Sequence, residues 1–227
     1  MTYTYPTVVF LKNIYINQKM VHTDQFCRVK TTIKQIVRDW SRLGERERSA
    51  SYGPALDILN CEYPTEAIDR SKIKILTPGS GLGRITWELF SHGFHSEGCE
   101  FSWYMILASQ FILNRCSADD VVFRIFPYIH ETCNLQSWSD ATTEATFPDV
   151  DLTATPEQGG TMEMGIGDFL DLYNEPAWHS VVTVFFVDTA HNIIEYVERI
   201  YKILLPGGLW VSFSNFLSFI FIQVIGK

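Results

Sequence analysis

The sequence predicts an α/β fold of the Rossmann type, with a largely parallel sheet that carries helices on both faces. Three observations support this prediction. A glycine-rich turn follows a short apolar run within residues 75–84, two later strand-like stretches end in acidic residues, and a P-G-G break at residues 206–208 follows a stretch with helical spacing. Continuous apolar runs are typical of strands buried in parallel sheets, and the carboxyl ends of such strands bind ligands.

An amphipathic helix is expected near the amino terminus. Its apolar stripe consists of Ile33, Ile36, Val37 and Trp40, and the opposite side carries Gln35, Arg38 and Arg42. By the usual amphipathic pattern the polar side is a solvated face. The sequence pattern alone gives it no further role.

The next signal is the stretch I-L-T-P-G-S-G-L-G-R at residues 75–84. Glycines at such a turn let a ligand approach the backbone. Glu100 lies 21 residues after Gly79, near the spacing at which the following strand offers a carboxylate to ribose hydroxyls. The G-x-G-x-G pattern is more typical of enzymes that use S-adenosylmethionine (SAM) than of dinucleotide enzymes. We therefore expect a nucleoside cofactor, with a plain strand-to-helix turn or a nicotinamide-binding oxidoreductase as alternatives.

Aromatic residues follow Glu100 in the next predicted helix. Trp103 and Phe111 are expected to pack in the core. Residues 133–160 are rich in Ser, Thr, Asp and Pro, so we expect a long surface connection there.

Two predicted strands of the second half end in acidic residues. Residues 162–169 alternate like a strand and end in Asp168 and Phe169. In a SAM site such an acid accepts the adenine amino hydrogen while the ring packs on the base, although Asp168 could instead cap the following helix. Residues 181–188 form a continuous apolar run that ends in Asp188, which either contacts the substrate or caps a helix from residue 190. A helix over residues 193–205 and a strand over 209–211 follow.

Composition favours a single cytoplasmic domain, with the nucleus as a second location. The chain has 227 residues, 46% of them hydrophobic, and a formal net charge of −8 without a basic block. Nucleic acid is therefore not an expected partner, because phosphate contacts need clustered Lys and Arg. The five cysteines are odd in number and scattered, which predicts neither a metal site nor a disulfide framework. No signal peptide is recognised in residues 1–20.

Six short motifs occur in a recognisable order along the chain: V-R-D-W-S at 37–41, P-G-S-G-L-G-R at 78–84, N-R-C-S at 114–117, F-P-D-V-D at 147–151, G-D-F at 167–169 and F-F-V-D-T-A-H-N at 185–192. They resemble the carnosine N-methyltransferase family over about residues 31–211. The resemblance implies a class I methyltransferase fold with a helical amino-terminal addition. It also implies SAM-dependent transfer of a methyl group to the imidazole of carnosine, or of a related histidine dipeptide, to give anserine.

The resemblance also implies a set of site residues. In the family, a Gln and an Arg of the amino-terminal helix hold the cofactor, which makes residues 31–70 a helical lid. The implied cofactor-binding residues are Gln35, Arg38, Gly79, Glu100, Asp168, Phe169 and Val184. Asp188 is the expected catalytic and substrate-binding residue, because a carboxylate that accepts one imidazole N–H leaves the other ring nitrogen free to react. His130 and His191 are expected to be structural.

The chain departs from the family pattern after residue 213. Members of the family continue with a motif whose histidine contacts the dipeptide, and in this chain Phe219 stands at the position of that histidine. We therefore divide the chain into a lead (1–30), a methyltransferase domain (31–213) and a divergent hydrophobic tail (214–227). The last strands of the sheet are expected to be missing, which would leave the strand at 209–213 with an open edge.

Two consequences for function follow from this departure. An open edge would allow a homodimer, and a truncated chain could bind SAM without catalysis and act as a binding protein. A membrane anchor in the tail is not expected, because the apolar stretch is shorter than the roughly 20 residues that span a bilayer.

Overall fold

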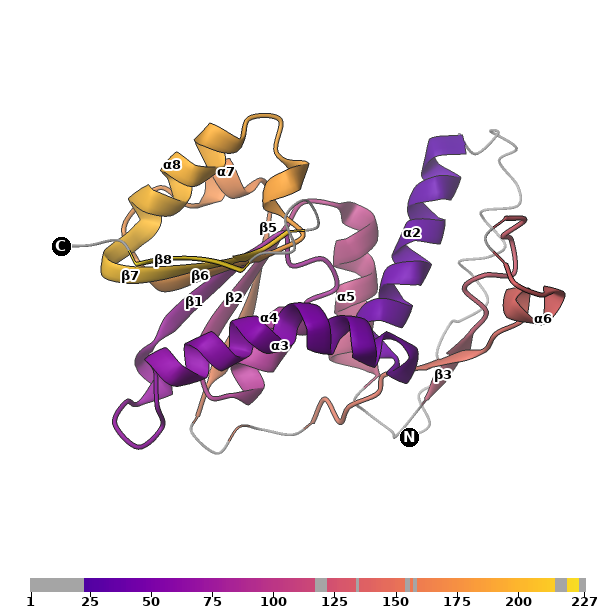
Figure 1. Cartoon of the computed structure of the whole chain (residues 1–227), viewed down its shortest axis with the longest axis horizontal. Helices are drawn as coiled ribbons and strands as arrows, with labels where there is room; N and C mark the ends of the chain where they lie inside the picture. Colours follow the sequence, from indigo (N-terminus) through magenta and orange to yellow (C-terminus); the bar gives the residue numbers. More distant parts are fainter. Residues whose placement is uncertain are drawn as a thin grey trace, which may run out of the picture.

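The centre of the molecule is a six-stranded sheet (Figure 1). The computed structural model describes residues 23–116, 122–133, 135–153, 156, 159–214 and 220–224. In spatial order the strands are β5 (Thr161–Ile166), β2 (His95–Glu100), β1 (Lys74–Pro78), β6 (Trp178–Val184), β7 (Leu204–Phe213) and β8 (Ile220–Val224). All neighbours pair in parallel except β7 and β8, which are antiparallel. The predicted α/β fold with a largely parallel sheet is confirmed.

Both faces of the sheet are buried, as its apolar strands predict. Helices α3 (Glu45–Glu62) and α4 (Arg84–Ser91) cover one face, and α7 (Phe169–Leu172) and α8 (Ile193–Ile203) cover the other (Figure 1). Successive strand residues point to opposite faces. Thus Ile75 packs with α3 and α4, whereas Leu76 packs with α7 and α8.

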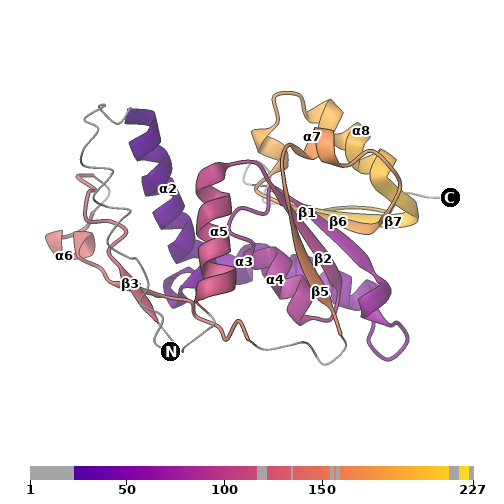
Figure 2. The same cartoon turned by 180° about the vertical axis from the view of Figure 1, so that it is seen from behind.

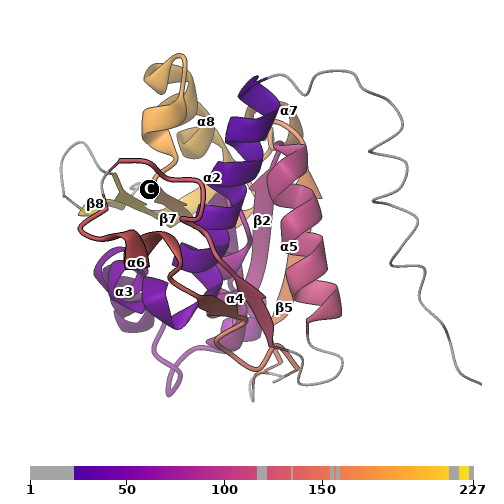
Figure 3. The same cartoon turned by 90° about the vertical axis from the view of Figure 1, so that its right-hand side faces the viewer.

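A helical layer stands beside the sheet. Helix α2 (Thr23–Trp40) lies next to α5 (Trp103–Arg115), as Figures 2 and 3 show from two directions. Trp40, at the end of α2, is fully buried, and its indole N–H donates to the carbonyl of Leu82 in the turn before α4 at 3.1 Å. A short 3-10 helix, η1 (Arg42–Gly44), links α2 to α3. The helical addition is confirmed, and its first helix begins earlier than the predicted residue 31.

The segment between α5 and β5 is more ordered than the sequence predicts. Strands β3 (Phe123–Ile125) and β4 (Ala145–Phe147) form an antiparallel pair, and α6 (Trp138–Ala141) lies between them in the chain. Phe147 is 4% exposed and contributes to the core. The expectation of a purely surface connection over residues 133–160 is therefore wrong.

The lateral edge of the sheet that the carboxyl-terminal strands form also differs from expectation. Strand β8 pairs with β7 from Leu209↔Val224 to Phe213↔Ile220. The predicted open edge at residues 209–213 is wrong, because backbone groups of the tail pair along it. Phe219 and the lead residues 1–22 lie outside the described residues.

Other boundaries show smaller differences. Helix α8 ends at Ile203, and β7 begins at Leu204, so residues 206–208 belong to the strand. Trp103 and Phe111 are 66% and 40% exposed, so their predicted place in the core is wrong. Two further 3-10 helices are η2 (Arg70–Lys72) and η3 (Val187–Thr189). Among the described helices, none is long and apolar enough to cross a membrane.

Candidate functional site

The glycine turn after β1 forms the floor of the site. Gly79 and Gly81 have φ angles of +64° and +55°, which side chains rarely adopt. A Cβ atom on Gly79 would lie 2.2 Å from Cδ2 of Phe186, and one on Gly81 would lie 3.3 Å from Oε1 of Gln35. Glycine at both positions therefore lets the side chains of Phe186 and Gln35 approach the turn closely.

Glu100, at the end of β2, holds this turn in place. Its Oε2 accepts the backbone N–H of Gly81 at 3.0 Å, and its Oε1 accepts those of Phe101 and Ser102 at 2.9 and 2.8 Å. A carboxylate offers about four acceptor sites. The Glu100 carboxylate thus organises the loops and retains room for another donor.

Asp168 and Phe169 start helix α7 at the end of β5. Asp168 Oδ1 accepts the N–H of Leu170 at 2.8 Å, so the predicted alternative role as a helix cap is confirmed. The carboxylate is nevertheless exposed, and its second oxygen remains available in the described structure. Phe169 is 3% exposed and packs edge-to-face on Phe186 and Tyr196 at 5.7 Å.

Arg38 approaches the site from helix α2. Its Nε donates to Oδ1 of Asp39 at 2.8 Å, and its Nη2 donates to Oε1 of Gln35 at 3.2 Å. Burial opposes the charge of Arg38, but the nearby Asp39 carboxylate outweighs this effect and raises its pKa. Asp39 also accepts the Tyr52 hydroxyl at 2.9 Å. Burial, and next the charge of Asp39, raise the pKa of that tyrosine.

The side chains of Arg38, Glu100, Asp168 and Phe169 converge on one cavity of about 490 Å³. Its lining includes every predicted cofactor-binding residue: Gln35, Arg38, Gly79, Glu100, Asp168, Phe169 and Val184. Sequence reasoning missed further lining residues, among them Met105, Phe185, Phe186, Thr189, His191 and Tyr196. His191, expected to be structural, thus borders the cavity.

Asp188 does not line the cavity, unlike its neighbours Thr189 and His191. Its Oδ1 is buried without a hydrogen-bond partner in the described structure. Asn192 caps helix α8 by accepting the N–H of Ile194 at 3.1 Å, so the alternative role of Asp188 as that cap is wrong. The aspartate carries an unsatisfied acceptor beside the cavity, which costs free energy unless a donor reaches it.

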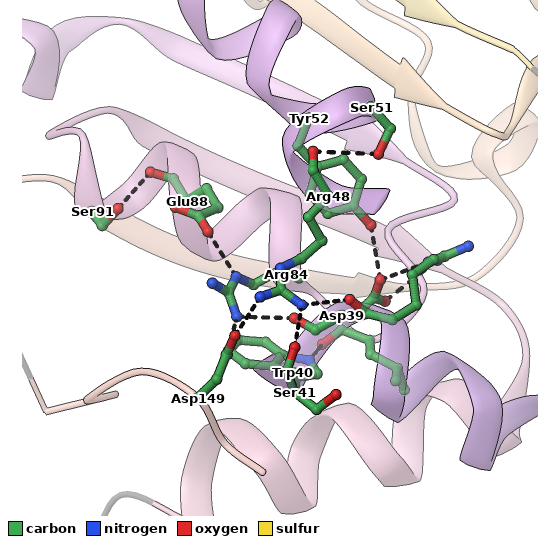
Figure 4. Close-up of polar contacts among 12 residues, drawn as sticks. Asp39, Trp40, Ser41, Arg48, Ser51, Tyr52, Arg84, Glu88, Ser91 and Asp149 are labelled. Carbon is green, nitrogen blue, oxygen red and sulfur yellow. Dashed lines mark hydrogen bonds and ion pairs between the residues drawn. The ribbon is translucent and has the colours of Figure 1, made fainter. Parts of the chain in front are cut away.

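A buried ion cluster fixes helix α2 to the domain (Figure 4). Arg84 of α4 and Arg48 of α3 both bind the carboxylate of Asp149, and all three side chains are at most 8% exposed. Arg84 Nη1 also donates to the Asp39 carbonyl at 2.9 Å, and Arg48 Nη1 donates to the Arg38 carbonyl at 2.6 Å. The two guanidinium groups therefore satisfy carbonyls that the end of α2 leaves without helical partners.

This cluster was not identified from the sequence. In the sequence, Arg84 ends the glycine-rich stretch and Asp149 lies in the F-P-D-V-D motif, and neither pattern indicates that the two residues meet. The Arg84 guanidinium also lies over the ring of Trp40 at 5.0 Å. Burial of three charges requires mutual pairing, and that pairing keeps Arg38 at the cavity.

Comparisons with known proteins identify one family. The family model described as carnosine N-methyltransferase matches residues 16–218. The carnosine N-methyltransferase of Mus musculus is 42% identical over 191 residues, which are 84% of this chain and 47% of that protein. The Schizosaccharomyces pombe enzyme of the same name is 38% identical over 201 residues, which are 87% of this chain and 54% of that protein.

A third relative, carnosine N-methyltransferase unmet of Drosophila melanogaster, is 40% identical over 84% of this chain and 41% of its own length. The chain thus spans about half the length of the curated relatives it matches. The matched range includes the glycine turn, helix α2 and both acidic strand ends. The chain belongs to the carnosine N-methyltransferase family.

Proposed function

We propose that this chain binds SAM in the cavity and transfers its methyl group to the imidazole of carnosine, or of a related histidine dipeptide, to give anserine. The observation that carries the proposal is the convergence of Arg38, Glu100 and Asp168 on one cavity beside a glycine turn. These residues come from three separate elements of the fold.

The polar side chains of the cavity fit the functional groups of the cofactor. The adenosine part of SAM offers ribose hydroxyls and an amino group as donors, for which Glu100 and Asp168 are acceptors. Its amino-acid part offers a carboxylate, for which a guanidinium is suited. Gly79 and Gly81, which have positive φ angles, place no Cβ atom at this side of the cavity. The cavity volume lies in the range of small-molecule sites.

The chemistry would need little acid or base catalysis from the protein. When bound, SAM supplies an already activated methyl group. The chain then orients a neutral imidazole and excludes water. Asp188 is next in sequence to Thr189, which lines the cavity, and its carboxylate would turn toward the cavity to accept one imidazole N–H. This contact would fix the tautomer and stabilise the positive charge that develops on the ring.

Calorimetry with SAM and S-adenosylhomocysteine, followed by mass spectrometry of a reaction with carnosine, tests this proposal. We expect saturable binding of both nucleosides and formation of methylated carnosine. Binding without product would favour the alternative, a SAM-binding protein without catalysis. Absence of binding to the folded chain would overturn the proposal.

Two further features are proposals of the same kind. A cytoplasmic location, with the nucleus as a second one, is supported by cysteines that are all free in the described structure. A homodimer stays a prediction, but the expected route through the edge of β7 is occupied by β8. Light scattering of the purified chain measures its oligomeric state.

A further inference from the structure

Phe185 has an unusual backbone conformation at the end of β6. Its φ angle is +55°, and it is the sole non-glycine residue with positive φ in the described part of the chain. For a bulky side chain this region is strained, and such strain gathers at functional sites. The backbone N–H of Phe185 donates to the Phe213 carbonyl at 2.9 Å, so pairing with β7 holds the conformation.

This conformation breaks the alternation of the strand. In a regular strand, successive side chains point to opposite faces. Here the three consecutive residues Val184, Phe185 and Phe186 all line the cavity. The Phe186 ring fills the place that a Cβ on Gly79 would take. The left-handed backbone conformation of Phe185 therefore directs its own ring and that of Phe186 toward the same cavity.

The Phe185 ring lies against the guanidinium of Arg38. The Arg38 Cζ is 5.5 Å from the ring centroid, within the range of a cation–π contact. The ring also meets Phe213 edge-to-face at 5.4 Å. Phe185 thus contacts both the end of β7 and helix α2.

Arg38 is the one Lys or Arg among the described residues that line the cavity. Asp39 and Gln35 engage its Nε and Nη2, and the Phe185 ring covers one face of the guanidinium. Its Nη1 has no hydrogen-bond partner among the described residues. The group is therefore constrained in direction but retains a donor for an anionic ligand.

We infer that Phe185 is a positioning residue, whose strained backbone sets its ring under Arg38 and so aims the guanidinium at the carboxylate of the cofactor. The inference rests on the proposed function, because it deepens the description of the same site. It assigns to Phe185 a role in recognising the amino-acid part of the cofactor and not the adenosine part.

Two ligands separate these parts. S-adenosylhomocysteine and 5′-methylthioadenosine share the adenosine and a neutral sulfur, but 5′-methylthioadenosine lacks the carboxylate. Calorimetry should show that Phe185→Ala weakens S-adenosylhomocysteine roughly tenfold and changes 5′-methylthioadenosine less than twofold. Phe185→Trp, which retains an aromatic face, should restore most of the affinity. Phe126→Ala, at an exposed phenylalanine that does not line the cavity, is the matched control and should change neither ligand.

Backbone strain is tested separately without ligand. Phe185→Gly and Phe185→Ala both remove the ring, but glycine accepts positive φ at no steric cost. Phe185→Gly should therefore melt at a higher temperature than Phe185→Ala. An equal or lower melting temperature would contradict the role of strain.

The outcomes distinguish this inference from the proposed function. If the wild-type chain bound both ligands and Phe185→Ala weakened them equally, Phe185 would shape the cavity without acting through Arg38, and the inference alone would be overturned. If the folded wild-type chain bound neither ligand, the proposed function would fail and the inference with it.

Discussion

Glu100 and Asp168 differ in how much of the protein depends on them. Glu100 accepts three backbone N–H groups from two loops, whereas Asp168 accepts one, at the start of α7. Loss of charge at Glu100 should therefore disturb both the fold and the ligand. Asp168 allows the proposed ligand contact to be tested almost alone.

Asp168→Asn should weaken SAM binding by about 1 kcal/mol, because a neutral amide oxygen replaces a charged acceptor. Stability should change little, since asparagine also caps helices well. Calorimetry gives the affinity and thermal denaturation gives the stability. Affinity equal to that of the wild type would place the adenine elsewhere. Glu100→Gln is the companion variant, and it should lose both affinity and stability.

Asp188→Asn should reduce turnover while leaving SAM affinity nearly unchanged. The amide offers an N–H as well as a carbonyl, so it fixes the imidazole tautomer poorly and stabilises less positive charge. Steady-state kinetics with carnosine and calorimetry with SAM measure the two effects. A collapse of SAM affinity would assign Asp188 to the cofactor site or to the scaffold.

At the scale of elements, the attachment of helix α2 to α3 and α4 decides whether Arg38 reaches the cavity. Asp149→Ala should lower the free energy of unfolding by about 3–5 kcal/mol, because it leaves Arg48 and Arg84 buried without their shared partner. Denaturant titration measures the loss. The control is Asp57→Ala on the exposed side of α3, which should stay within about 0.5 kcal/mol of the wild type. A similarly small loss for Asp149→Ala would show that the cluster contributes little.

Local patterns predicted most of the elements that carry the site. The glycine turn, the strand ends at Glu100 and Asp168, and the stripe of α2 each depend on residues close in sequence. The ion cluster could not be predicted in this way, because Asp149 lies 101 residues from Arg48 and 65 from Arg84. The positions of Phe185 and His191 on the cavity also depend on a backbone conformation that hydrophobic periodicity does not reveal.

For the whole molecule, β8 covers the edge of β7 and becomes the last strand of the sheet. Ile222→Pro should disrupt this antiparallel ladder, because proline lacks the backbone N–H. An unpaired strand edge promotes association between chains. Size-exclusion chromatography with light scattering should show larger species than for the wild type. An unchanged mass would indicate that β7 is protected in another way.

Two histidines make the stability depend on pH. Burial lowers the pKa of His92 and of His179 and so favours their neutral forms in the folded state. Their contribution is present above the ordinary histidine pKa of about 6.5 and is lost as the pH falls through the lower folded values. Denaturant unfolding at pH 7.5 and 5.5 should show lower stability at the acidic pH. His179→Asn should reduce this difference, and an unaltered difference would exclude a contribution from His179.

The shared aspartate of the ion cluster has a consequence for synthesis of the chain. Ribosomes deliver the amino-terminal helix first, and domains generally fold as the chain emerges. Asp149 is made long after Arg48 and Arg84, so the two arginines must remain hydrated until that residue arrives. The attachment of α2 to α3 and α4 is therefore completed late in synthesis, and a ribosome-stalled chain ending before residue 149 should be cut by protease within α2.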